Sequence, residues 1–272
     1  SLPPWHSRSM ARYEPRLPTN LCERVNEGTE GAPLVGVLAL HGGYHEHKVM
    51  LSRLGCCVRE IRQLPHLEGI DGLVIPGGES TTMGHLAERL GLLDPLRMFI
   101  ASGAPVMGTC AGLIFLANQV EGQKKGGQVL TGGMDLTVCR NFFGSQVDSF
   151  ETNLETPLAP GRQVPAVFIR APAILRTGAN VKILANVALE STKDDAVPKI
   201  APVAVQDGNL LGICFHPELS NDDCWHSHFL SLVKEHIASR NKKRKMDVLS
   251  TGKERLATKP KTAAVTKSIV AA

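Results

Sequence analysis

The sequence has few aromatic residues, no long apolar run and no paired cysteine motif. Aromatic side chains make up 4% of the 272 residues, so we expect a core built mainly from Leu, Val, Ile and Ala. No run approaches the roughly 18 apolar residues of a membrane-spanning helix, which argues against a membrane protein. The seven cysteines are an odd number without a C-x-x-C pair, and Cys56 and Cys57 are adjacent. This usage does not suit a disulfide framework and predicts a reducing, cytoplasmic location.

Acidic residues are scarce at one end of the chain. The whole sequence has 30 basic and 26 acidic residues, a net charge of +4. Residues 240–272 hold ten of the basic and two of the acidic residues, which gives this segment +8 and leaves −4 for the rest. Because the basic character belongs to an appendage, we expect no nucleic-acid partner for the main body.

Composition divides the chain into three parts. Residues 1–33 are interrupted by prolines and lack apolar periodicity, so we expect an irregular leader; its arginines are typical of a transit peptide, but its glutamates are not. Residues 34–238 are expected to form one domain. Residues 239–272 are rich in Lys, Ala and Thr, which predicts a disordered tail. Two interpretations of the basic run 242–245 stay open, a nuclear-import patch and a solvated tail.

The first half of the domain alternates between apolar runs and helix-like stretches. Most of the runs are continuously apolar, as in strands buried on both faces. Repeated strand–helix units favour a parallel sheet with helices on both faces. The expected strands are 34–40, 57–62, 72–76 and 105–108, and the expected helices are 44–54, 81–90 and 95–101.

The second half consists of short β-like pieces that follow a glycine-rich stretch. We expect them to extend the sheet with antiparallel or mixed strands, and a helix over 225–238 to close the fold. The sequence therefore predicts an α/β fold, a three-layer sandwich around a mostly parallel central sheet. The expected strands of this half are 136–140, 146–152, 166–170, 181–185, 202–206 and 210–215.

The most informative motif is Gly108-Thr109-Cys110-Ala111-Gly112, where an apolar run meets a helix-like segment. This is the cysteine form of the nucleophile elbow. The two glycines permit a tight strand-to-helix turn that a β-carbon would obstruct. The turn lifts the Cys110 side chain out of the sheet, and the helix N-terminus favours negative charge there. The motif predicts covalent acyl chemistry.

A histidine and a glutamate follow the expected strand 210–215. His216 lies at the end of this strand, where the active sites of α/β folds gather. It can take the proton of a thiol and later protonate a leaving amine. Glu218 can bind the other imidazole nitrogen and fix its tautomer. The order Cys110, His216, Glu218 predicts a catalytic triad.

A glycine pair follows the expected strand 72–76. Gly77 and Gly78 expose backbone N–H groups at a strand end that should neighbour the cysteine elbow. We expect the N–H groups of Gly78 and Ala111 to stabilise a tetrahedral oxyanion.

Five separated motifs together resemble a known family. Gly-Thr-Cys-Ala-Gly and Phe-His-Pro-Glu resemble the class I, triad-type glutamine amidotransferases, which have a flavodoxin-like form of the predicted fold. The other three narrow the resemblance to the glutaminase subunits of pyridoxal 5′-phosphate synthase, and the match covers residues 35–236. These three are Pro-Gly-Gly-Glu-Ser-Thr-Thr-Met at 76–83, Arg-Asn-Phe-Phe-Gly-Ser-Gln at 140–146 and Phe-Ile-Arg-Ala-Pro at 168–172.

The resemblance implies a specific reaction, with no cofactor and no metal. Cys110 would attack the side-chain amide of L-glutamine, giving a thioester and ammonia, and water would release glutamate. Two arginines suit a carboxylate and a glutamate suits an ammonium, which are the charges of free glutamine. By similarity, the substrate-binding residues are Gly78, Glu79, Ser80, Arg140, Ile169 and Arg170.

The resemblance also implies a partner. In this family the ammonia passes to a separate synthase subunit, which is a (β/α)8 barrel that builds the pyridoxal ring. No segment of this chain resembles that barrel, so the partner would be another polypeptide. Family glutaminases are poorly active until docked.

One position departs from the family pattern. The first strand of the family typically ends in Leu-Gln-Gly, whereas this chain has Leu40-His41-Gly42. The replaced glutamine lies near the oxyanion loop and the partner interface. This departure puts in question whether the partner activates the enzyme. It does not affect the prediction of the triad.

Three alternatives compete with this interpretation. A structural partner that is catalytically weak conflicts with an intact triad. A peptidase or thiol hydrolase conflicts with the two arginine motifs. A metal site conflicts with ligand spacing, since His226 and His228 would face different directions on a helix. The residues considered for metal binding were His41, His45, His47, Cys214, His216, Cys224, His226 and His228.

Overall fold

The computed structural model describes residues 31–122, 127–140, 149–188 and 200–257. Within them a seven-stranded sheet forms the centre, with the strand order β10-β11-β12-β4-β3-β1-β2. The five strands from β12 to β2 are parallel, and β11 and β10 are antiparallel additions at one edge. The predicted α/β fold with a mostly parallel central sheet is confirmed.

The strands of the parallel part are continuously buried, which explains their apolar sequences. β2 is the exception, because it lies at the sheet edge and its central residues are half-buried. The bounds are β1 Leu34–Leu38, β2 Cys57–Ile61, β3 Gly72–Ile75, β4 Val106–Thr109, β10 Lys182–Ala188, β11 Ile200–Asp207 and β12 Leu210–Ile213.

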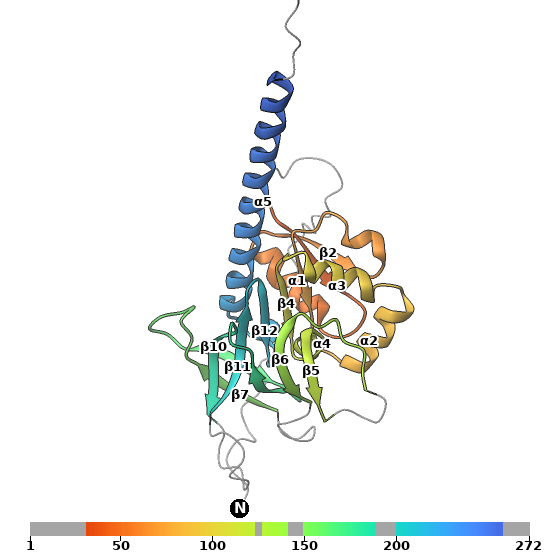
Figure 1. Cartoon of the computed structure of the whole chain (residues 1–272). Helices are drawn as coiled ribbons and strands as arrows, with labels where there is room; N and C mark the ends of the chain where they lie inside the picture. Colours follow the sequence, from red (N-terminus) through yellow and green to blue (C-terminus); the bar gives the residue numbers. More distant parts are fainter. Residues whose placement is uncertain (1–30, 123–126, 141–148, 189–199, 258–272) are drawn as a thin grey trace, which may run out of the picture.

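Helices cover both faces of the sheet (Figure 1). α1 and α5 lie on one face, where Gly72 of β3 leaves room for Phe229 and Val233 of α5. α2, α3 and α4 cover the other face, and α4 packs on β4, β3 and β12. Right-handed crossovers place these groups on opposite faces, because the chain moves from β1 to β2 in one direction and from β3 to β4 in the other. The bounds are α1 Tyr44–Arg53, α2 Ser80–Arg89, α3 Leu93–Ala101, α4 Ala111–Leu116 and α5 Cys224–Ala257.

The second half of the chain differs from our expectation. We expected its strands to extend the central sheet, but only β10, β11 and β12 do so. The others form a three-stranded sheet, β5-β6-β9, and a two-stranded sheet, β7-β8. β5 and β9 were not predicted, because they are short and carry polar residues on exposed positions. The bounds are β5 Ala117–Glu121, β6 Met134–Cys139, β7 Phe150–Leu154, β8 Val164–Phe168 and β9 Ala173–Thr177.

The last helix is longer than expected. We expected it to end at 238 and a disordered tail to follow, but α5 continues to Ala257. The physical reason is that 240–246 contains good helix formers, Lys, Arg and Met, without Pro or Gly. Three segments lie outside the described residues: residues 1–30 of the expected leader 1–33, residues 258–272 of the expected tail, and the first part of the expected strand 146–152.

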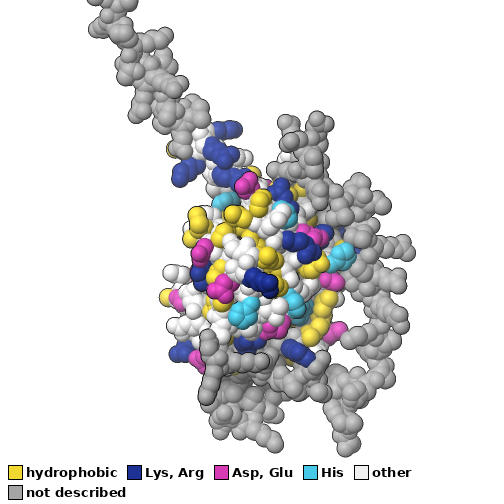
Figure 2. Space-filling view, turned by 90° about the vertical axis from the view of Figure 1, so that its right-hand side faces the viewer, with side chains coloured by type: hydrophobic (Ala, Val, Ile, Leu, Met, Phe, Trp, Pro, Cys, Tyr) yellow, Lys and Arg dark blue, Asp and Glu magenta, His cyan; other side chains and the backbone are white. Residues whose placement is uncertain are grey.

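α5 carries a basic surface away from the rest of the domain. Lys242, Lys243, Arg244 and Lys245 are exposed. Figure 2 shows Lys and Arg side chains gathered where α5 leaves the body, whereas charges of both signs mix with apolar side chains on the body itself. None of the described helices combines the length and apolar character that crossing a membrane requires.

Candidate active site

Loops that follow four parallel strands bring the predicted site residues together. His41 follows β1, Gly78 follows β3, Cys110 follows β4 and His216 follows β12. These strands are neighbours in the sheet, so their carboxyl ends meet at one edge. β1 and β3 flank the point at which the direction of chain winding reverses, which is where α/β sheets form their sites.

The backbone at Cys110 is strained. Its φ is 48° and its ψ is −103°, outside the conformations that a residue with a β-carbon prefers. The turn around it depends on close backbone packing. A β-carbon on Gly112 would lie 2.0 Å from the carbonyl oxygen of Ile75, and one on Gly108 would lie 2.6 Å from that of Gly112. The two glycines thus permit the elbow, and such strain is commonly stored at functional sites.

The side chains of His216 and Glu218 form a hydrogen-bonded pair beside this cysteine. His216 Nδ1 lies 2.8 Å from Glu218 Oε1. Gly77 packs against both partners of the expected proton transfer, because a β-carbon there would lie 2.4 Å from His216 Cε1 and 3.3 Å from Cys110 Cβ. The three predicted triad residues therefore lie side by side, with the imidazole between the thiol and the carboxylate.

The electrostatics of the pair favour a charged imidazole and a charged carboxylate. Burial alone would lower the pKa of His216, but hydrogen bonds with Cys110 and Glu218 outweigh it and raise the pKa to about 10. Burial alone would raise the pKa of Glu218, but the nearby His47 and the hydrogen bond with His216 lower it. Glu218 is buried, so the two histidines provide the compensation that a buried carboxylate needs.

The glycine loop lies against the end of β1. Gly43 N–H donates to the carbonyl oxygen of Gly77 at 3.2 Å, and Glu79 N–H donates to His41 Nδ1 at 3.3 Å. His41, the residue that departs from the family pattern, therefore holds the loop that contains Gly78. Gly78 has a φ of 157°, and a β-carbon there would lie 2.7 Å from His41 Nδ1. That Gly78 and Ala111 form an oxyanion site stays a prediction.

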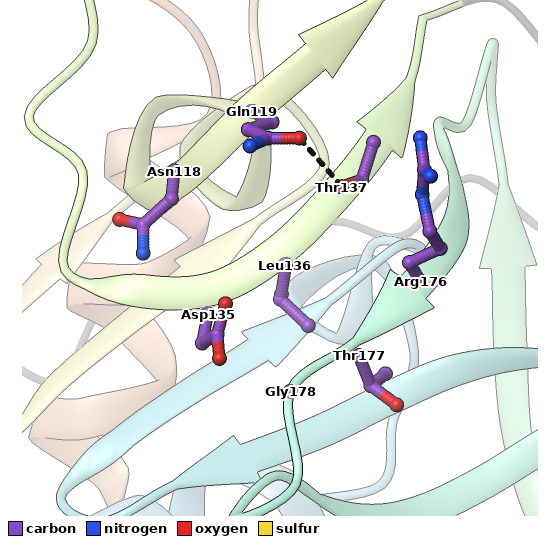
Figure 3. A pocket seen from close by; sticks show the side chains of 8 residues that line it. All are labelled: Asn118, Gln119, Asp135, Leu136, Thr137, Arg176, Thr177 and Gly178. Atoms are coloured by element: carbon purple, nitrogen blue, oxygen red, sulfur yellow. Dashed lines mark hydrogen bonds between the residues drawn. The ribbon is translucent and has the colours of Figure 1, made fainter.

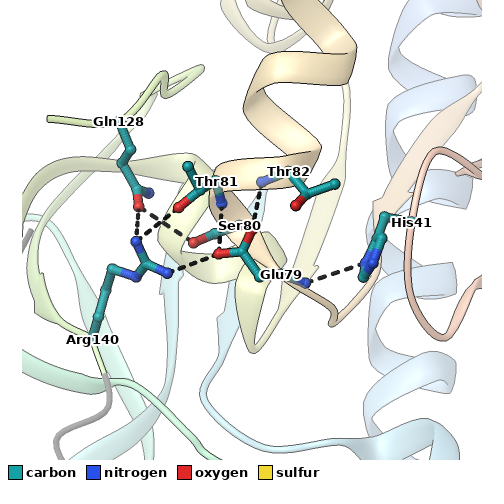
Figure 4. A network of polar contacts seen from close by, with 7 residues as sticks. All are labelled: His41, Glu79, Ser80, Thr81, Thr82, Gln128 and Arg140. Carbon is teal, nitrogen blue, oxygen red and sulfur yellow. Dashed lines mark hydrogen bonds and ion pairs between the residues drawn. The ribbon is translucent and has the colours of Figure 1, made fainter. Parts of the chain in front are cut away.

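Three of the expected substrate-binding residues meet in one polar network (Figure 4). Arg140 Nη2 pairs with Glu79 Oε1 at 2.9 Å, and Arg140 Nη1 donates to Thr81 and Gln128. Ser80 Oγ donates to Gln128 Oε1 at 3.3 Å. Glu79 also caps α2 through the N–H groups of Thr81 and Thr82, and these bonds lower its pKa to about 2 although burial opposes them.

Two further expected substrate-binding residues, Ile169 and Arg170, directly follow β8. The Cys110 thiol donates to the carbonyl oxygen of Ile169 at 3.9 Å. Arg170 has a φ of 47°. Among the non-glycine residues that the structure describes, only Arg170 and Cys110 have a positive φ. Its side chain is exposed, so it is free to point towards a ligand.

A separate pocket lies between β5, β6 and β9 and has a volume of about 310 Å³ (Figure 3). No expected site residue lines it. Arg176 in its wall pairs with Glu121, and Thr137 donates to Gln119. This pocket is lined by neither cysteine nor histidine and is not the site that the motifs predict.

Two residues beside the triad were missed as parts of the site. His47 and His226 were weighed only as metal ligands, but their side chains contact each other behind Glu218. His228 instead approaches Gln206, so the two α5 histidines do face different directions. Among the residues described, no group of three His, Cys, Asp or Glu side chains is placed to hold a metal ion. No local sequence pattern joins His47 to His226, because they lie 179 positions apart in the chain.

A strained cysteine elbow on a parallel sheet, facing a His–Glu pair, defines a triad-type glutamine amidotransferase of class I. Residues 37–235 match the SNO glutamine amidotransferase family, and the chain belongs to this family.

Curated relatives agree with this assignment. The "Probable pyridoxal 5'-phosphate synthase subunit PDX2" of Arabidopsis thaliana is 48% identical over 219 residues, which cover 74% of this chain and 86% of the relative. The "Pyridoxal 5'-phosphate synthase subunit PdxT" of Corynebacterium jeikeium is 47% identical over 207 residues, which cover 74% of this chain and 97% of the relative.

Solved structures show the same fold. A glutamine amidotransferase crystal structure matches with a TM-score of 0.64 and 43% identity, over 73% of this chain and 98% of that one. A GMP synthase component from Thermoplasma acidophilum matches with a TM-score of 0.52 over 79% of this chain and 98% of that one. Because the identity of the second match is 16%, it supports the assignment of the fold alone.

Proposed function

We propose that this chain is a glutaminase that hydrolyses L-glutamine to glutamate and ammonia. Cys110 Sγ attacks the side-chain amide carbon, and the proton that leaves the thiol is the one that His216 holds as a charged imidazole. His216 then gives this proton to the leaving nitrogen, so that ammonia departs and a thioester remains. Water, deprotonated by His216, attacks the thioester and releases glutamate and the thiol. Glu218 orients the imidazole throughout.

The loops around the cysteine suit a free amino acid. In this proposal, the N–H groups of Gly78 and Ala111 stabilise the tetrahedral oxyanion. Glu79 binds the α-ammonium, and Arg140 and Arg170 supply planar donors for the α-carboxylate. Ser80 and the backbone of Ile169 complete the contacts. Support comes from the network that joins Glu79, Ser80 and Arg140 beside the site.

The ammonia is delivered to a separate component of pyridoxal 5′-phosphate synthase, which is a (β/α)8 barrel that builds the pyridoxal ring. The names of relatives support this part of the proposal, since two of 47% and 48% identity are synthase subunits by name.

The protein acts in the cytoplasm in this proposal, where free glutamine and a reducing environment suit a catalytic thiol. The exposed basic run 242–245 on α5 supports a nuclear fraction as a further possibility to test. A fluorescent fusion of the full chain, compared with one in which these four residues are alanine, would measure it.

The observation that carries the proposal is the strained Cys110 beside the His216–Glu218 pair. The test is glutamate release from L-glutamine by the wild type and Cys110→Ser, each with and without a pyridoxal 5′-phosphate synthase barrel subunit. We expect turnover that requires both Cys110 and the partner, and Cys110→Ser that still binds the partner. If the wild type binds the partner but never releases glutamate, the chain has only a structural role and the proposal fails.

A further inference from the structure

A buried polar cluster lies behind the triad, and the proposed mechanism does not use it. It consists of His47 from α1, Thr109 from β4 and His226 from α5, and the side chains of all three are fully buried. Fully buried histidines and hydroxyls are costly unless they are bonded to partners. The cluster adjoins Glu218, which is itself buried, so its geometry bears on the catalytic carboxylate.

The two oxygens of Glu218 face two different imidazoles. Oε1 lies 2.8 Å from Nδ1 of His216, and Oε2 lies 3.3 Å from Nε2 of His47. The same Nε2 lies 3.1 Å from Thr109 Oγ1. Among the described residues Glu218 Oε2 has no hydrogen-bond partner, and His47 Nε2, 3.3 Å away, is the nitrogen placed to become one.

The second nitrogen of His47 determines which tautomer fits. His47 Nδ1 lies 2.9 Å from His226 Nε2, so one of these atoms donates and the other accepts. If His47 Nδ1 donated, the lone pair of its Nε2 would face the Glu218 carboxylate and repel it. If His226 Nε2 donates, His47 Nε2 carries a proton beside two acceptors, Thr109 Oγ1 at 3.1 Å and Glu218 Oε2 at 3.3 Å. His226 Nδ1 has no hydrogen-bond partner among the described residues. In this assignment that atom carries a lone pair and not an N–H, so it is not a buried donor without an acceptor.

Burial favours the neutral form of His47. Burial lowers the pKa of His47, Glu218 and Glu46 raise it, and His216 lowers it further. Burial also lowers the pKa of His226, to about 3. Burial therefore favours the uncharged form of both imidazoles. A neutral donor can orient the carboxylate without competing with His216 for its charge.

We propose that His47 is a positioning residue for the triad, whose Nε2–H fixes Glu218 against His216 while His226 fixes the tautomer of His47. The inference rests on the proposed glutaminase activity. It predicts that catalysis depends on residues outside the triad of Cys110, His216 and Glu218, because side chains of α1 and α5 orient the Glu218 carboxylate.

The test measures glutamate release in the presence of the synthase barrel subunit for His47→Leu, His47→Gln and His47→Asn. His47→Leu should lower kcat on the order of tenfold to a hundredfold and change KM for glutamine less than about twofold. A glutamine amide nitrogen reaches near the place of Nε2, whereas an asparagine amide reaches only near Nδ1. His47→Gln should therefore keep more activity than His47→Asn.

A double-mutant cycle separates positioning from general loss of structure. In a Glu218→Gln background, His47→Leu should lower kcat little further, because the carboxylate that it positions is gone. His228→Leu is the matched control on α5, since this histidine contacts Gln206 and not the triad. Its kcat should equal that of the wild type.

Each outcome decides the matter. Wild-type kcat in His47→Leu would overturn the inference, as would an equal loss in the two Glu218 backgrounds. If His47→Leu does not fold, equal activity of His47→Gln and His47→Asn would overturn it. Turnover by the wild type in the same assay tests the proposed glutaminase activity separately. An inactive wild type would refute that activity, and the positioning role that rests on it would fall with it.

Discussion

At the scale of single residues, the triad depends on compensation between burial and hydrogen bonding. Glu218 is almost fully buried, which alone would keep its carboxyl neutral, and His216 is mostly buried, which alone would keep its imidazole neutral. Their contact reverses both tendencies. The protonation of each residue is therefore a property of the site and not of the isolated side chain.

This compensation predicts a pH dependence of stability. The folded pKa of His216 is about 10, above its ordinary value of 6.5. Below pH 6.5 the residue is protonated in both states and its stabilising contribution is fully present. Between 6.5 and 10 the unfolded chain loses the proton first, so the contribution falls as pH rises. Urea unfolding of the wild type across this range should show the fall.

Cys110→Ala is the control for this titration. The hydrogen bond with Cys110 is the largest cause that raises the pKa of His216, so its removal should make the fall less steep. NMR titration of the His216 ring would show the same difference directly. An identical ring titration in the two proteins would contradict the coupling between thiol and imidazole.

His41 gives a second prediction at this scale. Its Nδ1 accepts the N–H of Glu79 at 3.3 Å, and a glutamine amide oxygen could accept the same bond. His41→Gln should therefore keep kcat within about twofold in the presence of the synthase subunit, whereas His41→Leu should lower it by about two- to tenfold, the value of one hydrogen bond. His45→Leu, an exposed change on α1, is the control. Unchanged kcat in His41→Leu would exclude a role in holding the loop.

At the scale of elements, the cysteine elbow packs closely against β3 because Gly112 has no β-carbon. Gly112→Ala would place a methyl group 2.0 Å from the Ile75 carbonyl. Because the backbone must move, we expect a loss of about 2–3 kcal/mol in the free energy of unfolding and most of the glutaminase activity. Urea unfolding and a turnover assay measure the two effects.

Gly103→Ala is the matched comparison. It has a φ of 78° with open space around it, so a β-carbon adds conformational strain and no collision. It should cost about 1–2 kcal/mol and leave kcat unchanged, since it lies before β4 and not at its carboxyl end. If Gly112→Ala retained full turnover, the tight strand-to-helix packing would not be what holds the cysteine.

The elements also show how far sequence alone reaches. Continuous apolar runs identified β1, β3 and β4, because strands buried on both faces need no polar positions. β5 and β9 escaped notice, because exposed polar residues interrupt their patterns. Gly108 and Gly112 mark the elbow locally. The contact of His47 with His226 joins residues 179 apart, and only the packing of α1 against α5 reveals it.

At the scale of the whole molecule, α5 connects the two ends of the sheet. It begins near the site, where His226 contacts His47, and it runs to the other end, where Arg240 Nη2 pairs with Asp71 Oδ1 at 2.6 Å. Asp71 directly precedes β3 and is 3% exposed, and its Oδ2 accepts the N–H of Leu34 at 2.9 Å. The basic end of α5 therefore leaves the molecule opposite the active site (Figure 1).

This arrangement predicts the effect of shortening the chain. A chain that ends after residue 241 keeps Arg240 and should match the wild type in both stability and partner-dependent turnover. A chain that ends after residue 239 removes the ion pair of Arg240 with the buried Asp71, which should cost on the order of 1–3 kcal/mol. Its turnover per folded molecule should still be unchanged, because the lost contact lies at the amino ends of the strands. Urea unfolding and glutamate release would separate these effects, and a loss of turnover in the longer chain would instead assign the basic end of α5 a part in catalysis or docking.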